Sequence, residues 1–150
     1  MKSESPLVHF RQRTLTYGDN NGSIIHLSQQ CFSDCVWILI TEDDTCTPGV
    51  VLRSDPLESG PLNTNSNNNW AGDKTMPATP CECLLGMRDH PLTNVLASAT
   101  AGIIQQQGER RPILMCISVT KTAKRLESAA DRMAFVRTVK DEVMKLATGA

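Results

Sequence analysis

The sequence predicts an α+β domain with a mostly antiparallel six-stranded sheet and two helices on one face. Residues 7–53 contain four short strand-like segments that are separated by turn-forming residues. Two later segments, 91–107 and 123–146, show the apolar spacing of amphipathic helices. Short apolar runs at 81–85 and 113–119 stand on either side of the first helix and predict two further strands.

The first half of the chain predicts four strands joined by hairpin turns. These strands span residues 7–16, 23–28, 35–41 and 50–53. The segment from Gly18 to Gly22 is rich in Gly, Asn and Asp, which favour turns for backbone reasons. Cys35 to Thr41 is an unbroken apolar run, typical of a strand that is buried on both faces.

Residues 55–80 differ from the rest of the chain in composition. Asn, Ser, Thr, Pro and Gly dominate, and no hydrophobic period is present. We therefore expect a single domain over residues 1–150 with a flexible insert at 55–80. Trp70 is the one large apolar side chain of the insert's central part, and it is a tether to its own domain or a docking anchor.

Residues 81–108 predict a strand, a turn and a helix. Pro91 suits the first helical position, because its missing N–H has no helical partner there. Asp89 or His90 can cap the exposed N–H groups, and Gly108 stands where a left-handed end is expected. The predicted core-facing stripe consists of Leu92, Val95, Leu96, Ala99 and Ile103.

The last segment, from about Ala123 to Leu146, predicts one long helix that follows the strand 113–119. Its main apolar stripe is Leu126, Ala129, Ala130, Met133, Val136 and Val143. Phe135 and Val139 lie beside that stripe and widen it. A wide stripe fits either contact beyond the sheet or a well-buried terminal helix.

Two predicted strands are apolar on both faces, which is unusual for an antiparallel sheet with one face in water. If the helices cover the side of Val36 and Ile38, another layer must cover Trp37 and Leu39. An uncovered apolar patch usually marks a protein interface. We therefore expect a second, similar subunit packed sheet to sheet. The predicted partner interface consists of Trp37, Leu39, Val51, Leu114 and Cys116.

Composition argues against several classes of function. The net charge of −1 gives no electrostatic case for nucleic acid or an anionic membrane as a partner. No apolar run has the length of a membrane span, and the first residues lack the apolar stretch of a signal peptide. The expected location is the cytoplasm, and also the nucleus, where the six cysteines stay reduced.

The residues with catalytic or metal-binding chemistry form no recognisable site. Cys31 and Cys35, and likewise Cys81 and Cys83, stand in or next to strands, where small buried thiols are common and zinc ligation is the alternative. The pair Asp43-Asp44 lies in a predicted turn, which explains it better than acid–base catalysis. We therefore predict no enzyme activity, no cofactor and no metal.

Five basic residues lie close to the strand 113–119 in the sequence. They are Arg110, Arg111, Lys121, Lys124 and Arg125. Together they predict either a solvated face or a docking patch for an acidic partner.

Several segments, taken in order, resemble the proteasome assembly chaperone 3 family. They are Pro6-Leu7-Val8 with Gln12-Arg13-Thr14, Ser33 to Thr41, Gly49 to Leu52, Leu84-Leu85-Gly86 with Pro91-Leu92, Val95 and Ala97, and Arg111 to Val119. The similarity covers most of the chain outside 55–80. The turn from Glu42 to Pro48 lacks the family's glycine-lysine pattern, and the insert and the last helix are longer. Residues 137–144 also resemble the related chaperone 4 family, so the type stays open between the two.

The resemblance implies a non-enzymatic role. Such chaperones act as dimers, commonly of the two related proteins, and hold proteasome alpha-type subunits, notably the fifth, while the alpha ring of the 20S core forms. They leave before the proteasome matures. Two other classes remain as alternatives: a small α+β scaffold or adaptor of a signalling or trafficking complex, and a cysteine- or zinc-dependent enzyme.

Overall fold

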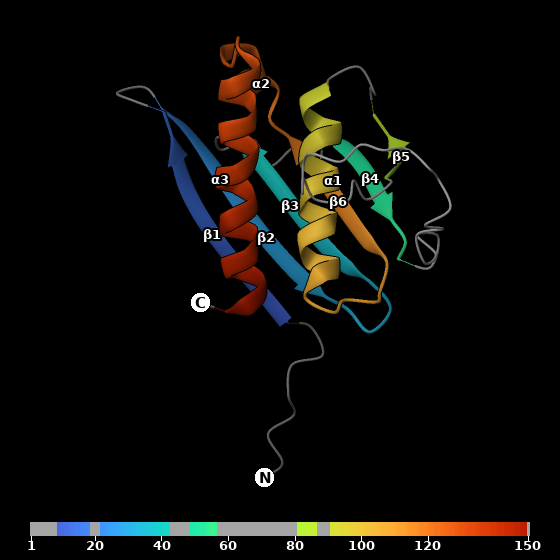
Figure 1. The fold of residues 1–150 in the computed structure, drawn as a ribbon. Helices are drawn as coiled ribbons and strands as arrows, with labels where there is room; N and C mark the ends of the chain where they lie inside the picture. The colour runs from blue at the N-terminus through green and yellow to red at the C-terminus, as the bar shows by residue number, and fades with distance from the viewer. Residues whose placement is uncertain (1–8, 19–21, 43–48, 57–80, 87–90, 150) are drawn as a thin grey trace, which may run out of the picture.

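The computed structural model describes residues 9–18, 22–42, 49–56, 81–86 and 91–149. They form the predicted α+β fold, a six-stranded sheet with α1 and α3 side by side on one face (Figure 1). The strands are β1 (His9–Tyr17), β2 (Ser23–Cys31), β3 (Val36–Glu42), β4 (Val50–Ser54), β5 (Glu82–Leu85) and β6 (Ile113–Ser118). The helices are α1 (Pro91–Gln106), α2 (Thr120–Arg125) and α3 (Ala129–Thr148).

The strand order in the sheet is β1-β2-β3-β6-β4-β5. Four neighbouring pairs are antiparallel, and β3 and β6 are parallel, so the prediction of a mostly antiparallel sheet is confirmed. The two continuously apolar segments of the sequence, β3 and β6, are neighbours at the centre of the sheet. The sequence did not predict that these two strands pair in parallel.

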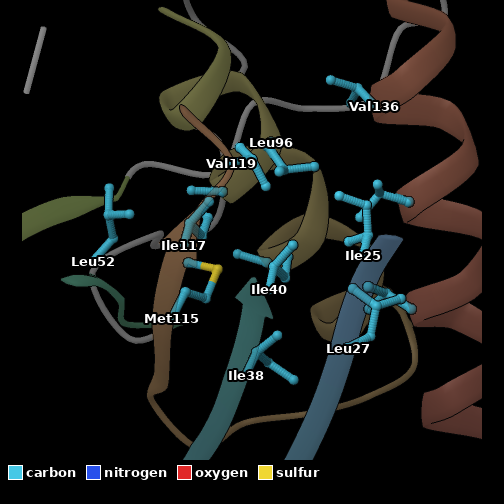
Figure 2. Packing of buried hydrophobic residues seen from close by; sticks show 14 of the residues in the cluster. Ile25, Leu27, Ile38, Ile40, Leu52, Leu96, Met115, Ile117, Val119 and Val136 are labelled. Carbon is cyan, nitrogen blue, oxygen red and sulfur yellow. The ribbon is translucent and has the colours of Figure 1, made fainter. Parts of the chain in front are cut away.

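The core lies between the sheet and the two long helices (Figure 2). Successive side chains of a strand point to opposite faces, so alternate residues of each central strand enter this core. On β3 these are Val36, Ile38 and Ile40, all completely buried. From the helices, Leu96 of α1 and Phe135 of α3 pack into the same cluster.

Helix α1 begins at Pro91, as predicted, and ends before Gly108. Gly108 has a φ of 90°, and its N–H donates to the carbonyl of Gln105 at 3.0 Å, which closes the helix end. The stripe prediction was wrong at one position, because Val95 is 43% exposed. The neighbouring Ala97 is completely buried instead, so the covered side of the helix is rotated away from Val95.

The prediction of one helix from about 123 to 146 was wrong, because the chain forms two helices with a break between them. Leu126 is extended, with ψ of 91°, and its side chain is buried in the core. Ser128 then starts α3 by accepting a hydrogen bond from the N–H of Asp131 at 3.0 Å. A Ser followed three residues later by an acidic residue is a helix-start signal, and it outweighed the continuous apolar period.

The apolar stripe predicted for the last helix was right for Leu126, Val136 and Val143, which are buried, and wrong for its other three residues. Met133 is 45% exposed, and Ala129 and Ala130 are exposed as well. Phe135, which the sequence placed beside the stripe, is completely buried and meets Tyr17 of β1 edge to face, with ring centroids 5.0 Å apart. The buried side of α3 consists of Phe135, Val136, Val139, Val143 and Leu146.

Several predictions fall outside the described residues: the insert from residue 57 on with Trp70, the pair Asp43-Asp44, and the cap at Asp89 or His90. Among the residues that are described, none of the helices is both long and apolar enough to span a membrane.

Candidate functional site

All five residues of the predicted partner interface lie on the sheet face opposite α1 and α3, which we call the open face. In the register of the three central strands, Trp37 of β3 pairs with Leu114 of β6, and Leu39 pairs with Cys116. Cys116 pairs on its other side with Val51 of β4. The five side chains are therefore direct neighbours on β3, β6 and β4, although they are far apart in the sequence.

The open face is only partly covered by the described part of the chain. Both long helices pack on the other face, and the indole of Trp37 is 43% exposed. Leu39, Val51 and Leu114 are half-buried by their neighbours on the sheet. Within this chain the Trp37 side of β3 faces outward, so burial of β3 on both faces stays a prediction that requires a second subunit on the open face.

Cys116 has a different position from the other four residues. It is only 2% exposed, and its sulfur accepts a hydrogen bond from the indole Nε1–H of Trp37 at 3.1 Å. Cys116 thus offers almost no contact area of its own. Its effect on the open face is to hold the orientation of Trp37.

A shallow hollow of about 150 Å³ lies beside Trp37 on the open face. Leu39 lines it on β3, and Ser28 and Gln30 line it on β2. An apolar floor with two polar side chains at its rim can receive an apolar side chain of a partner and bind the neighbouring polar groups.

The open face extends further than the sequence indicated. Phe10 of β1 pairs with Gln30, which in turn pairs with Trp37, so Phe10 lies on the same face and is 52% exposed. The register also places Ile24 and Leu85 there, with 43% and 64% exposure. The alternation of apolar and polar residues around Phe10 is visible in the sequence. Which face of the sheet Phe10 lies on depends on the strand pairing.

The described cysteines form no disulfide with one another, and four of them lie outside the open face: Cys31, Cys35, Cys81 and Cys83. Within the described ranges, no three His, Cys, Asp or Glu side chains are grouped so that they could hold a metal ion. Cys81 and Cys83 line a hollow beside Asn94 and Ser98 of α1. Burial raises the pKa of the Cys81 thiol, which disfavours the nucleophilic thiolate.

The five basic residues predicted as one patch do not form one. Arg110 and Arg111 precede β6, whereas Lys121, Lys124 and Arg125 follow it on α2. Six residues of extended strand separate the groups by roughly 20 Å. The two basic groups are close in the sequence because β6 has only 6 residues. An extended strand of that length places the groups at opposite ends of the sheet.

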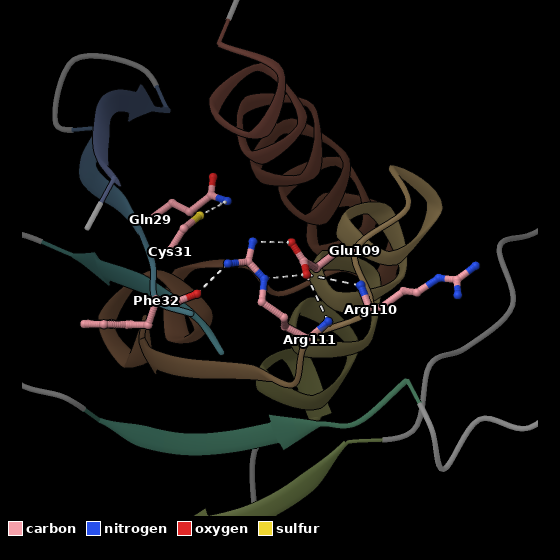
Figure 3. A network of polar contacts seen from close by, with 6 residues as sticks. All are labelled: Gln29, Cys31, Phe32, Glu109, Arg110 and Arg111. Carbon is pink, nitrogen blue, oxygen red and sulfur yellow. Dashed lines mark hydrogen bonds and ion pairs between the residues drawn. The ribbon is translucent and has the colours of Figure 1, made fainter. Parts of the chain in front are cut away.

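Arg111 belongs to a polar network with Glu109 (Figure 3). Its Nε–H and Nη2–H groups donate to the two carboxylate oxygens of Glu109 at 2.8 and 2.9 Å, and its Nη1–H donates to the carbonyl of Phe32. These contacts tie the segment before β6 to the turn between β2 and β3. The guanidinium of Arg111 lowers the pKa of the Glu109 carboxyl.

Comparisons with known proteins give one family match and a structural match to the same fold. Residues 62–141, just over half of the chain, match the family model described as proteasome assembly chaperone 3. A solved structure from "a Novel Chaperone Complex for Yeast 20S Proteasome Assembly" has the same fold, with a TM-score of 0.57 at 11% identity. The alignment covers 90% of this chain and 98% of that one. No curated protein matches the chain.

Proposed function

Because the chain belongs to the proteasome assembly chaperone 3 family, we propose that it is a non-enzymatic chaperone that binds alpha-type subunits during alpha-ring assembly of the 20S core. The observation that carries this proposal is the open face, an apolar surface at the centre of the sheet that the described helices leave uncovered. Its exposed Trp37 is the kind of residue that dominates protein interfaces.

The partner on the open face is, in this proposal, a second assembly-chaperone chain. Six strands about 4.8 Å apart and about six residues long cover roughly 24 by 20 Å. That plane is about 480 Å², so the ends of the strands and the neighbouring segments would supply the rest of the ~800 Å² per partner of a specific interface. A sheet is the natural cover, because two apolar sheet faces pack well at about 10 Å.

Pairing through the open face leaves other surfaces for the proteasome subunit. The helix side and the ends of the sheet stay accessible, and they carry mixed charges, including the basic residues of α2. A polar, modest contact suits a chaperone that must release its subunit. The proposed location is the cytoplasm, and also the nucleus.

The test is affinity capture of the tagged chain from an extract of the cells that make it, with quantitative mass spectrometry. The proposal predicts that 20S alpha-type subunits and a related assembly chaperone are enriched over an untagged control. It also predicts that subunits of the mature proteasome's regulatory particle are absent. Capture of signalling or trafficking proteins without 20S subunits would instead support the adaptor alternative and contradict the chaperone.

A further inference from the structure

A third cavity lies on the helix side of the sheet, away from the open face. Its volume is about 440 Å³, and it is formed by β1, the end of β2 with the following turn, the segment before β6, and the end of α3. The residues that give it its chemistry are Arg11, Gln29, Ser33 and Arg111 (Figure 3 shows Gln29 and Arg111).

Gln29 lines this cavity and carries a buried polar atom that has no partner among the described residues. Its side chain is 7% exposed, and its amide nitrogen donates to the sulfur of Cys31 at 3.4 Å. Its Oε1 has no hydrogen-bond partner among the described residues. Turning the amide over only exchanges the two atoms, so one buried polar atom lacks a partner in either orientation. Such a group is costly unless a ligand or water satisfies it.

The guanidinium groups of Arg11 and Arg111 line the same cavity, together with the carboxylate of Glu109. Arg11 uses its Nη1 to donate to the carbonyls of Leu146 and Ala147 at 3.0 and 2.9 Å. Its Nε–H and Nη2–H groups have no partner among the described residues. Glu109 neutralises Arg111, which leaves the lining with an excess of one positive charge.

We propose that this cavity binds a carboxylate group carried on a peptide of a partner protein. The carboxylate receives hydrogen bonds from Arg11, whose planar fork fits it well. A peptide group next to the carboxylate offers both an N–H and a C=O, so it satisfies either end of the Gln29 amide once that side chain turns its buried end toward the cavity. The lining residues of β1 and β2 point to the helix side, so the cavity stays open when a second chain covers the open face.

The test uses the full chain labelled with ¹⁵N and the probe peptide N-acetyl-Ala-Glu-Ala-amide. The matched control peptide has Gln in place of Glu, and butyrate is the small acid with the same single charge and no peptide group. We expect saturable shifts of the amide signals of Gln29, Ser33 and Ala147 with the Glu peptide, and about tenfold weaker binding of the Gln peptide. Equal or tighter binding of butyrate would contradict a peptide ligand, and no saturable shift with any probe would overturn the site.

Variants of the chain test whether the Glu peptide binds in this cavity or is attracted to the charged surface in general. Gln29→Leu and Arg11→Gln should each weaken the Glu peptide about tenfold, whereas Arg110→Gln should not, because that neighbouring side chain points away from the network in Figure 3. Glu109→Gln should tighten binding severalfold, since it removes the carboxylate that competes for Arg111. This gain cannot come from misfolding, and unchanged or weaker binding by Glu109→Gln would contradict the proposal.

Discussion

The indole Nε1–H of Trp37 donates a hydrogen bond to the sulfur of Cys116, 3.1 Å away, on the face of the sheet that the helices leave open. The contact joins the two central parallel strands, β3 and β6, at the side-chain level. It fixes the largest exposed side chain of β3 before any partner arrives. A side chain that is already ordered loses less conformational entropy on binding.

Cys116→Ala should therefore weaken association with the chaperone partner by roughly two- to tenfold, the cost of immobilising one free side chain. The affinity is measured by titration of the partner captured from cells. Cys116→Ser is the control, because its hydroxyl still accepts a hydrogen bond from Trp37. Equal affinity of the Ala and Ser variants would show that this contact does not prepare the open face.

The burial of α3 predicts opposite outcomes for two neighbouring residues. Phe135→Ala should lower the free energy of unfolding by about 3 to 5 kcal/mol, because the ring is completely buried in the core. Met133→Ala should change it by no more than about 0.5 kcal/mol, because that side chain is 45% exposed. Urea denaturation measures both, and a larger loss for Met133→Ala than for Phe135→Ala would refute the observed orientation of α3.

Glu42 holds the start of α2 from the end of β3. Its carboxylate is buried and accepts hydrogen bonds from the backbone N–H groups of Lys121 and Thr122 at 2.6 and 2.8 Å, and from the Thr122 hydroxyl at 2.8 Å. Glu42→Ala leaves these donors unpaired and should cost about 2 to 4 kcal/mol of unfolding free energy. Glu42→Gln keeps one acceptor and should cost less, as thermal or urea denaturation will show; an unaffected Ala variant would contradict this role.

Glu142 should make the stability of the protein depend on pH. Its hydrogen bond from Lys145 at 2.8 Å, together with Arg13 of β1 at 2.8 Å, lowers the pKa of the carboxyl below its ordinary value of 4.5. A lowered folded-state pKa stabilises the folded protein above the ordinary pKa, and the contribution is lost as the pH falls through the folded-state value. The wild type should thus be more stable than Glu142→Gln at pH 7, and the two should converge as the pH falls below 4.5.

The control for this pH dependence is Glu127→Gln, because Glu127 is exposed and has no ion pair among the described residues. Its stability difference from the wild type should be small at every pH. A gap between the wild type and Glu142→Gln that stays constant from pH 7 to pH 3 would show that the ion pair does not cause it.

Most of the fold could be predicted from local patterns. Pro91 and Gly108 mark the limits of α1, and the apolar run from Val36 predicts the central strand β3, because these signals act within a few residues. The last helix was predicted less well. Met133 and Phe135 are both apolar, and each can form a helical stripe with Val136. The edge-to-face contact of Phe135 with Tyr17 shows that the Phe135 side is the buried one.

The candidate interface was accessible to sequence reasoning because β3 and β6 are apolar on both sides, which two helices cannot cover. Phe10 and Ile24 were missed as parts of it, since their sheet face follows from a register that no local pattern fixes. The cavity at Gln29 was missed as well. It joins residues from four separate segments, and none of them has an unusual sequence context.

The pairing of the open face is tested most directly by the molar mass from light scattering of the 16.4-kDa chain, alone at micromolar concentration and mixed with the related chaperone. We predict the mass of a pair in at least one of these samples, and the same mass for Met133→Arg, whose side chain is as exposed as Trp37 but lies on α3. Trp37→Arg should give only single chains. A wild type that stays single in both samples, or a Trp37→Arg variant that still pairs, would contradict an interface on the open face.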